Sequence, residues 1–318
     1  MLRPVLDPRR APTVTETSAP LNTHSADPVT RAATINGVNT VTITEFTDPG
    51  CPWAWSAEPF RRRLTWVYGD RLQWRTCMVG LAETPQEYED KGFTPERQAQ
   101  AFASIAHAHG MPIDTEQRSR MAATLPACRA VAATRLHAPE RERGILRRLR
   151  VHNFAGALLD DPQTIAAAAR DAGVDPEQLR TWTEDPEVER VLRQDMDRAR
   201  EPMAAARALD HKLANWSGGQ RYTCPSYELD RGDGVRLAVP GFQPFATYDV
   251  LLANLIPDAP RRPAAEHVGD VLAWTGTPLA TREVAEVRDI PFVQAREELG
   301  RVAVEQHVGA DGLWTLAA

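Results

Sequence analysis

One stretch near the N-terminus decides the fold, and it reads VTITEFTDPGCPWAW from Val41 to Trp55. Its first half alternates apolar and polar side chains, as a β-strand does, until Asp48-Pro49-Gly50 interrupts the alternation. Pro52 then stands where a helix favours proline, at its first position. The stretch therefore predicts a strand, a turn and a helix, with Cys51 at the start of the helix.

A cysteine at that place is a candidate nucleophile. Backbone N–H groups and the positive end of the helix dipole favour an anion there, so a thiol ionises more readily than a free one. We expect the sulfur of Cys51 to be exposed and ionised. The alternative is an ordinary residue at a helix end, or a relic of a lost activity.

Residues Asp48 to Trp55, directly after a strand, resemble the active-site start of the DsbA family of thioredoxin-like proteins. The likeness is greatest to the cytoplasmic branch that contains FrnE-type oxidoreductases, kappa-class glutathione transferases and hydroxychromene-carboxylate isomerases. Redox members carry Cys-Pro-Trp-Cys, whereas the fourth position here is Ala54. The resemblance implies that Cys51 is catalytic and forms mixed disulfides, but it cannot close a ring with its own i+3 neighbour.

The second informative stretch runs from Ser217 to Phe242 and predicts a β-hairpin with its turn at Asp233-Gly234. The resemblance implies that Pro225 is a cis-proline whose loop packs against the catalytic cysteine. It also places Cys224 beside Cys51, either as the resolving thiol or as a small residue tolerated in a tight loop. The substrate contacts that it implies are Pro52, Trp53, Ala54, Trp55, Thr223 and Pro225.

The chain as a whole is predicted to be an α/β protein with a thioredoxin-like fold, a large helical insertion and a small C-terminal module. The pairs Asp161-Pro162, Asp175-Pro176 and Asp185-Pro186 each look like a helix N-cap followed by proline. The C-terminal pattern of three helices followed by strand-forming residues resembles a winged helix, with Thr281 as the expected N-cap of the first helix of its turn. The predicted parts are a disordered tail (1–36), the thioredoxin-like domain in two segments (37–83 and 216–257), the helical insertion (84–215) and the winged-helix-like module (263–318).

Seven arginines and only two glutamates lie between Arg129 and His152. Such a basic face is suited to an anionic substrate, or to the carboxylates of a small thiol such as glutathione or mycothiol. Ile145, Leu146 and Leu149 between the arginines favour the alternative, an amphipathic helix whose arginine side is solvated. We expect most of these arginines to be solvated, with one or two of them near the site. Cys77 and Cys128 are predicted to be buried, structural thiols.

Composition narrows the class of protein. The 318 residues are 42% hydrophobic and 25% charged, as in a globular protein, and the net charge of −6 argues against a general nucleic-acid or membrane-surface binder. Four cysteines without a close pair indicate reduced thiols, and no stretch is apolar enough for a signal peptide or a membrane span. We therefore expect a cytoplasmic protein without a metal site, and a homodimer stays open.

Three functions follow from these observations. The first is a thiol oxidoreductase or thiol transferase that acts on a small-molecule or protein thiol or disulfide through Cys51. The second is a thiol-dependent isomerase or transferase for an aromatic compound, with Trp53 and Trp55 as pocket walls. The third is a non-catalytic adaptor that uses the C-terminal module for a partner. We expect no tightly bound cofactor, with glutathione or mycothiol as the candidate small thiol.

Overall fold

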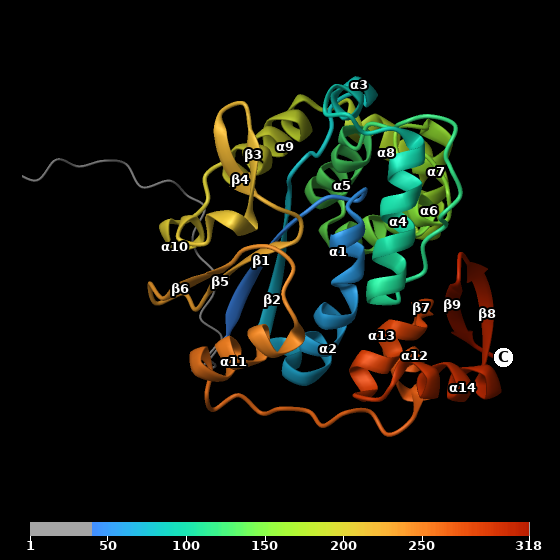
Figure 1. Cartoon of the computed structure of the whole chain (residues 1–318). Coiled ribbons are helices and arrows are strands. Elements are labelled where there is room, and N and C mark those ends of the chain that lie inside the picture. The colour runs from blue at the N-terminus through green and yellow to red at the C-terminus, as the bar shows by residue number, and fades with distance from the viewer. Residues whose placement is uncertain (1–39, 318) are drawn as a thin grey trace, which may run out of the picture. The chain divides into compact units, whose positions relative to one another are not determined.

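The computed structural model describes residues 40–317, so the tail predicted for residues 1–36 lies outside the described residues. Figure 1 shows a mixed α/β chain with a small sheet, a group of helices and a C-terminal module. The helices are inserted between the first two strands of the sheet and its last two. The predicted fold class is confirmed. Between residues 40 and 317, no helix is both long and apolar enough to cross a membrane.

The thioredoxin-like part is built on a four-stranded sheet. Its strands, in the order in which they neighbour one another, are β2 (Leu72–Met78), β1 (Val41–Thr47), β5 (Ser226–Asp230) and β6 (Arg236–Val239). Strands β1 and β2 are parallel, and β5 is antiparallel to both β1 and β6. The predicted helix between β1 and β2 is present, but it is divided at Ala57 into α1 (Pro52–Ser56) and α2 (Glu58–Tyr68). Helix α11 (Phe245–Leu255) completes this part.

Between β2 and β3 the chain consists of helices and the loops that connect them, and residues 79–212 contain no strand. They are α3 (Pro85–Asp90), α4 (Pro95–His109), α5 (Leu125–His137), α6 (Glu142–Phe154), α7 (Pro162–Asp171), α8 (Pro176–Thr183), α9 (Pro186–Ala199) and α10 (Ala204–Arg207). The predicted helix starts at Asp161, Asp175 and Asp185 are confirmed, since each carboxylate accepts a hydrogen bond from a backbone N–H in the first turn of its helix.

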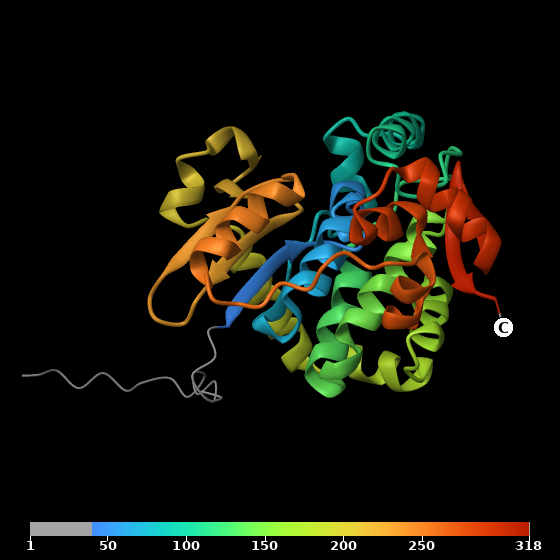
Figure 2. The same cartoon turned by 90° about the horizontal axis from the view of Figure 1, so that it is seen from below.

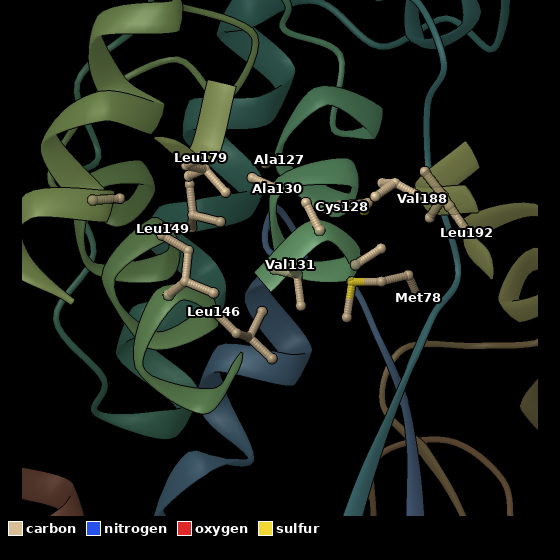
Figure 3. Packing of buried hydrophobic residues seen from close by; sticks show 14 of the residues in the cluster. Met78, Ala127, Cys128, Ala130, Val131, Leu146, Leu149, Leu179, Val188 and Leu192 are labelled. Atoms are coloured by element: carbon tan, nitrogen blue, oxygen red, sulfur yellow. The ribbon is translucent and has the colours of Figure 1, made fainter. Parts of the chain in front are cut away.

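An apolar core joins these helices to the edge of the sheet. Figure 3 shows Met78 of β2 packed among residues of four helices, with Cys128 and Val131 of α5 and Leu192 of α9 among them. Cys128 is fully buried and Cys77 is 2% exposed, as predicted for structural thiols. The sheet edge is therefore closed by the helical insertion.

A second hairpin, β3 (Leu213–Trp216) with β4 (Gly219–Tyr222), was not predicted. Its strands are only four residues long, and just one residue of the two, Tyr222, is fully buried. Without an alternating apolar pattern, the sequence offers only the glycines at its turn as a signal. This hairpin lies between α10 and β5 in the chain and contributes to the surroundings of Cys51.

The C-terminal module contains three helices and a three-stranded sheet in the order β7-β9-β8. Its elements are α12 (Val268–Thr275), β7 (Leu279–Ala280), α13 (Thr281–Arg288), α14 (Phe292–Val302), β8 (Ala303–Val308) and β9 (Asp311–Leu316). Trp66 of α2 shares an apolar cluster with Val284 and Val287 of α13. Figure 2 shows the module, in red, beside both α2 and the green helices of the insertion.

Thr281 was predicted as an N-cap, and this was wrong. Ala280 occupies the capping position, where its N–H donates to Glu283 at 2.8 Å. The hydroxyl of Thr281 instead donates to Asp311 of β9 at 2.8 Å. Because a partner on a distant strand takes this hydroxyl, the local sequence signal was misleading.

The expectation that the arginines of α6 are solvated was wrong for Arg150 and Arg147. Arg150 is fully buried and donates to Thr47 and to the carboxylates of Glu45 and Glu58. Burial alone would raise the pKa of Glu45, but the positive charges of Arg143 and Arg150 outweigh it and hold that pKa below its usual range. The carboxylates of Glu45 on β1 and Glu58 on α2 thus stabilise the buried, charged side chain of Arg150.

We predict that Arg150→Ala lowers the free energy of unfolding by about 3 to 5 kcal/mol, because two buried carboxylates lose their fully buried partner and keep only the more exposed Arg143 and Arg61. Denaturant unfolding followed by circular dichroism measures this change. Arg190→Ala is the matched control, since Arg190 is exposed on α9 and pairs only with Glu187 of its own helix; it should change stability by less than about 0.5 kcal/mol. Equal effects of the two variants would contradict the structural importance of Arg150.

Candidate thiol site

Cys51 lies in the turn that connects β1 to α1. Its N–H donates to the Asp48 carbonyl oxygen at 3.2 Å, and its own carbonyl accepts from Trp55 N at 3.1 Å, so the residue closes the turn and caps the helix. Pro52 provides the first helical position, as predicted. The sequence therefore fixes where the thiol stands by local signals alone.

The loop before β5 brings the second half of the site. The peptide bond between Cys224 and Pro225 is cis, as the resemblance implied. Strand β5 begins one residue later, and its Ser226 pairs with Phe46 near the end of β1. The thiol of Cys51 consequently reaches the carbonyl oxygen of Cys224 and donates to it at 3.2 Å, across 173 residues of sequence.

The two thiols have different tendencies to ionise. Burial alone would raise the pKa of Cys51, but a hydrogen bond from the Cys224 side chain and the backbone N–H groups of Ala54 and Trp53 outweigh it, so the pKa is lowered. Burial and the neighbouring negative charge of Cys51 hold the pKa of Cys224 well above its usual range. Cys51 is therefore the thiol of the pair that ionises more readily, and Cys224 the one that keeps its proton to higher pH.

The expected exposure of Cys51 was wrong. The residue is 5% exposed and Cys224 is 8% exposed. Both belong to an apolar cluster that includes Tyr222 of β4 and Ala206 of α10, with Leu213 of β3 packed against it. The hairpin that the sequence did not predict thus helps to cover the sulfur. All four cysteines of the chain are free thiols in this structure.

Sequence reasoning missed two residues beside the thiols. Asp48 is fully buried and accepts hydrogen bonds from Gly50 N at 2.8 Å, Leu81 N at 2.9 Å and Thr124 Oγ1 at 2.9 Å. Burial raises its pKa, and these donors only partly oppose that effect. The sequence analysis used Asp48 only as part of the turn that ends the strand. Its place three residues before Cys51 was nevertheless a signal that a carboxylate could lie close to the thiol.

Tyr88 of α3 is the second missed residue. Burial, followed by the negative charges of Asp48 and Cys51, holds the pKa of its phenol well above the usual range. The phenol is thus within electrostatic range of Asp48 and Cys51, and its ring packs against Phe93 at a centroid distance of 5.9 Å. No local pattern in the sequence connects α3 to this site.

The predicted substrate-contact residues separate into exposed and buried ones. Trp53 is 42% exposed and forms an aromatic group with His109 and Phe242, at ring-centroid distances of 5.1 and 5.6 Å. Trp55 instead is 1% exposed and donates to the Pro112 carbonyl at 2.9 Å, so it belongs to the core and does not form a pocket wall.

The remaining predicted contacts surround the two thiols. Ala54 is 1% exposed and Pro225 is buried, whereas Pro52 is half-buried. Thr223 is half-buried, and its hydroxyl donates to the Lys212 carbonyl at 2.8 Å, which fixes the loop before Cys224. Among residues 40–317, no cluster of His, Cys, Asp and Glu could hold a metal ion. The site as it stands is suited to thiol chemistry.

Two curated relatives match most of the chain, and both are the ClpXP adapter protein SpxH. That of Halalkalibacterium halodurans is 24% identical over 275 residues, covering 83% of this chain and 83% of the relative. That of Shouchella clausii is 23% identical over 271 residues, covering 84% of each.

Among solved structures, a proposed protein disulfide isomerase from Nitrosomonas europaea superimposes with a TM-score of 0.53 and 17% identity, covering 69% of this chain and 98% of that chain. This likeness shows the fold alone. The DSBA-like thioredoxin domain family matches residues 42–205, a region that contains β1, the Cys51 turn and the whole helical insertion up to α10. The chain therefore belongs to the DSBA-like thioredoxin domain family.

Proposed function

We propose that this protein carries out thiol–disulfide exchange, with Cys51 as the attacking thiolate and Cys224 as the second thiol. The observation that carries the proposal is the hydrogen bond from the Cys51 thiol to the carbonyl oxygen of Cys224 beside Pro225, together with the lowered pKa of Cys51. Ala54 offers no thiol at the usual i+3 position. A cysteine from the loop before β5 takes its place in this proposal.

The reaction balances as two exchanges. The Cys51 thiolate attacks one sulfur of a disulfide RSSR, the S–S bond breaks, and RS⁻ leaves while Cys51 stays joined to the other RS group. Cys224 then loses its proton and attacks the Cys51 sulfur, which forms a Cys51–Cys224 disulfide and releases the second RS⁻. The substrate is reduced to two thiols, and a small thiol such as glutathione or mycothiol reduces the protein again by the reverse steps.

The exposed aromatic group supports this function by offering a surface for substrate. Trp53, His109 and Phe242 lie next to the Cys51 turn, and Trp53 follows the cysteine by two residues. Aromatic side chains bury a large apolar area with few rotatable bonds. A peptide or the apolar part of a thiol compound can rest on this group while its disulfide reaches Cys51.

An adaptor function is the second candidate, because both curated relatives are adapter proteins and match more than four fifths of this chain. The low exposure of Cys51 also favours it. An adaptor uses its surface to bind a partner and needs no thiol chemistry. Cys51→Ser separates the two candidates: binding of purified ClpX, measured by titration calorimetry, stays unchanged in an adaptor, whereas exchange activity disappears in an oxidoreductase.

We predict selective alkylation of Cys51 in the folded protein. Its pKa lies below the usual 9.0, so its thiolate fraction and its labelling rate should reach their midpoint below pH 9.0. Cys77 and Cys128 are buried and their pKa values are raised, so they serve as internal controls that stay unlabelled. Iodoacetamide labelling across pH, mapped by peptide mass spectrometry, gives the rates. Equal inertness of all four cysteines would count against an active thiolate.

We further predict that Cys224→Ser traps a mixed disulfide between Cys51 and glutathione when the protein is incubated with oxidised glutathione. The wild type should pass through that adduct and release it, because Cys224 completes the second exchange. Intact-mass spectrometry over time distinguishes the two. Ala54→Cys added to Cys224→Ser is the control, since it returns a thiol to the i+3 position and should again release the adduct. Persistence of the adduct in the wild type as well would show that Cys224 does not resolve it.

A further inference from the structure

A cavity of about 560 Å³ lies away from the thiol site, between α2, the helices α6 and α7, and the Thr275–Thr277 turn of the C-terminal module. Seven arginines and only three carboxylates line it, and neither Cys51 nor Cys224 is among its lining residues. Figure 2 shows the red C-terminal module beside the green helices of the insertion. The cavity thus joins three parts of the fold.

The arginines at the cavity outnumber the carboxylates near them. Arg62 and Arg147 share Glu283, Arg143 pairs with Glu45, and Arg141 lies 3.9 Å from Glu140. Glu58 accepts from Arg150 and lies 3.5 Å from Arg143. Asp171 is bound to His152 at 2.9 Å. Two further lining arginines, Arg148 and Arg170, form no ion pair with any residue between 40 and 317. The cavity therefore carries a surplus of positive charge.

Buried donors also remain without acceptors. Arg147 is 7% exposed; its Nη2 donates to Glu283 at 2.6 Å and to the Pro278 carbonyl at 3.2 Å, while its Nε and Nη1 have no hydrogen-bond partner among the described residues. The hydroxyl of Thr277, the residue next to Pro278, also lines this cavity and is likewise unpartnered within residues 40–317. Buried polar groups normally have partners, so several donors left open at one cavity indicate a missing acceptor.

Arg61 on α2 adds to this pattern. Its nearest carboxylate oxygen is that of Glu45, 3.7 Å from Nε. Burial, followed by repulsion from Arg143, lowers the pKa of Arg61 to about 9. Because burial and the nearby charge of Arg143 disfavour the charged form of Arg61, an additional anion in the cavity would stabilise it.

We propose that this cavity binds a small molecule that carries a diphosphate group. Guanidinium groups match phosphate oxygens with two parallel hydrogen bonds, and several of them around one cavity fit a group with more than one negative charge. The volume is within the range of small-molecule sites and exceeds the need of a single phosphate ion. Bound there, the anion connects α6 to the Thr275–Thr277 turn and so fastens the C-terminal module to the insertion.

Titration calorimetry of the full chain with inorganic pyrophosphate, at constant ionic strength, tests this site. We expect saturable binding with one site per chain. Arg148→Gln combined with Arg170→Gln should weaken it by about tenfold or more, since each charge-assisted hydrogen bond contributes substantially. Thr277→Val, which removes only the unpartnered hydroxyl, should weaken it by about threefold to tenfold.

Arg75→Gln combined with Arg190→Gln is the matched control, because it removes the same charge from exposed arginines outside the cavity. It should leave the pyrophosphate affinity unchanged within about twofold, because these arginines are far from the ligand and screened by salt. Citrate at the same charge should bind more weakly than pyrophosphate. An equal loss in both double variants, tighter binding of citrate, or no saturable binding by the wild type would overturn the proposal.

Discussion

The register between β1 and β5 is the constraint on which the thiol site depends. Phe46 near the end of β1 pairs with Ser226 at the start of β5. The turn to Cys51 and the loop with Cys224 therefore lie at the same end of these two central strands. A shift of the register would move the two cysteines apart. The hydrogen bond from Cys51 to the Cys224 carbonyl is therefore a consequence of strand pairing, and the turn chemistry of each loop only refines it.

Helix α6 connects the sheet to both α2 and the C-terminal module through buried ion pairs. Arg150 reaches Glu45 of β1 and Glu58 of α2, and Arg147, one turn earlier, reaches Glu283 of α13. One helix of the insertion thus contacts both the thioredoxin-like part and the C-terminal module. Buried ion pairs of this kind cost desolvation energy, and they persist where each charge keeps its partners. The insertion consequently fixes the relative placement of α2 and α13.

The sequence was informative where the structure is decided locally. The turn before Cys51 and the helix starts at Asp161 and Asp175 follow from residue types within a few positions of one another. The cis-proline at Pro225 followed only from the family resemblance. The burial of Arg150 could not be predicted, because its partners lie about a hundred residues away in the chain. The covering of Cys51 was missed for a related reason: β3 and β4 are short, and their apolar residues are too few to form a pattern.

Peptide mapping of the protein after mild oxidation, without reduction, tests the central claim most directly. If Cys51 and Cys224 are a working thiol pair, the account predicts one disulfide-linked pair of peptides that contains these two residues, with Cys77 and Cys128 still reduced. The Cys51 thiol already lies within hydrogen-bond distance of the Cys224 backbone, and both cysteines belong to one buried cluster. An oxidised protein in which Cys51 pairs with neither Cys224 nor a small thiol would contradict the account.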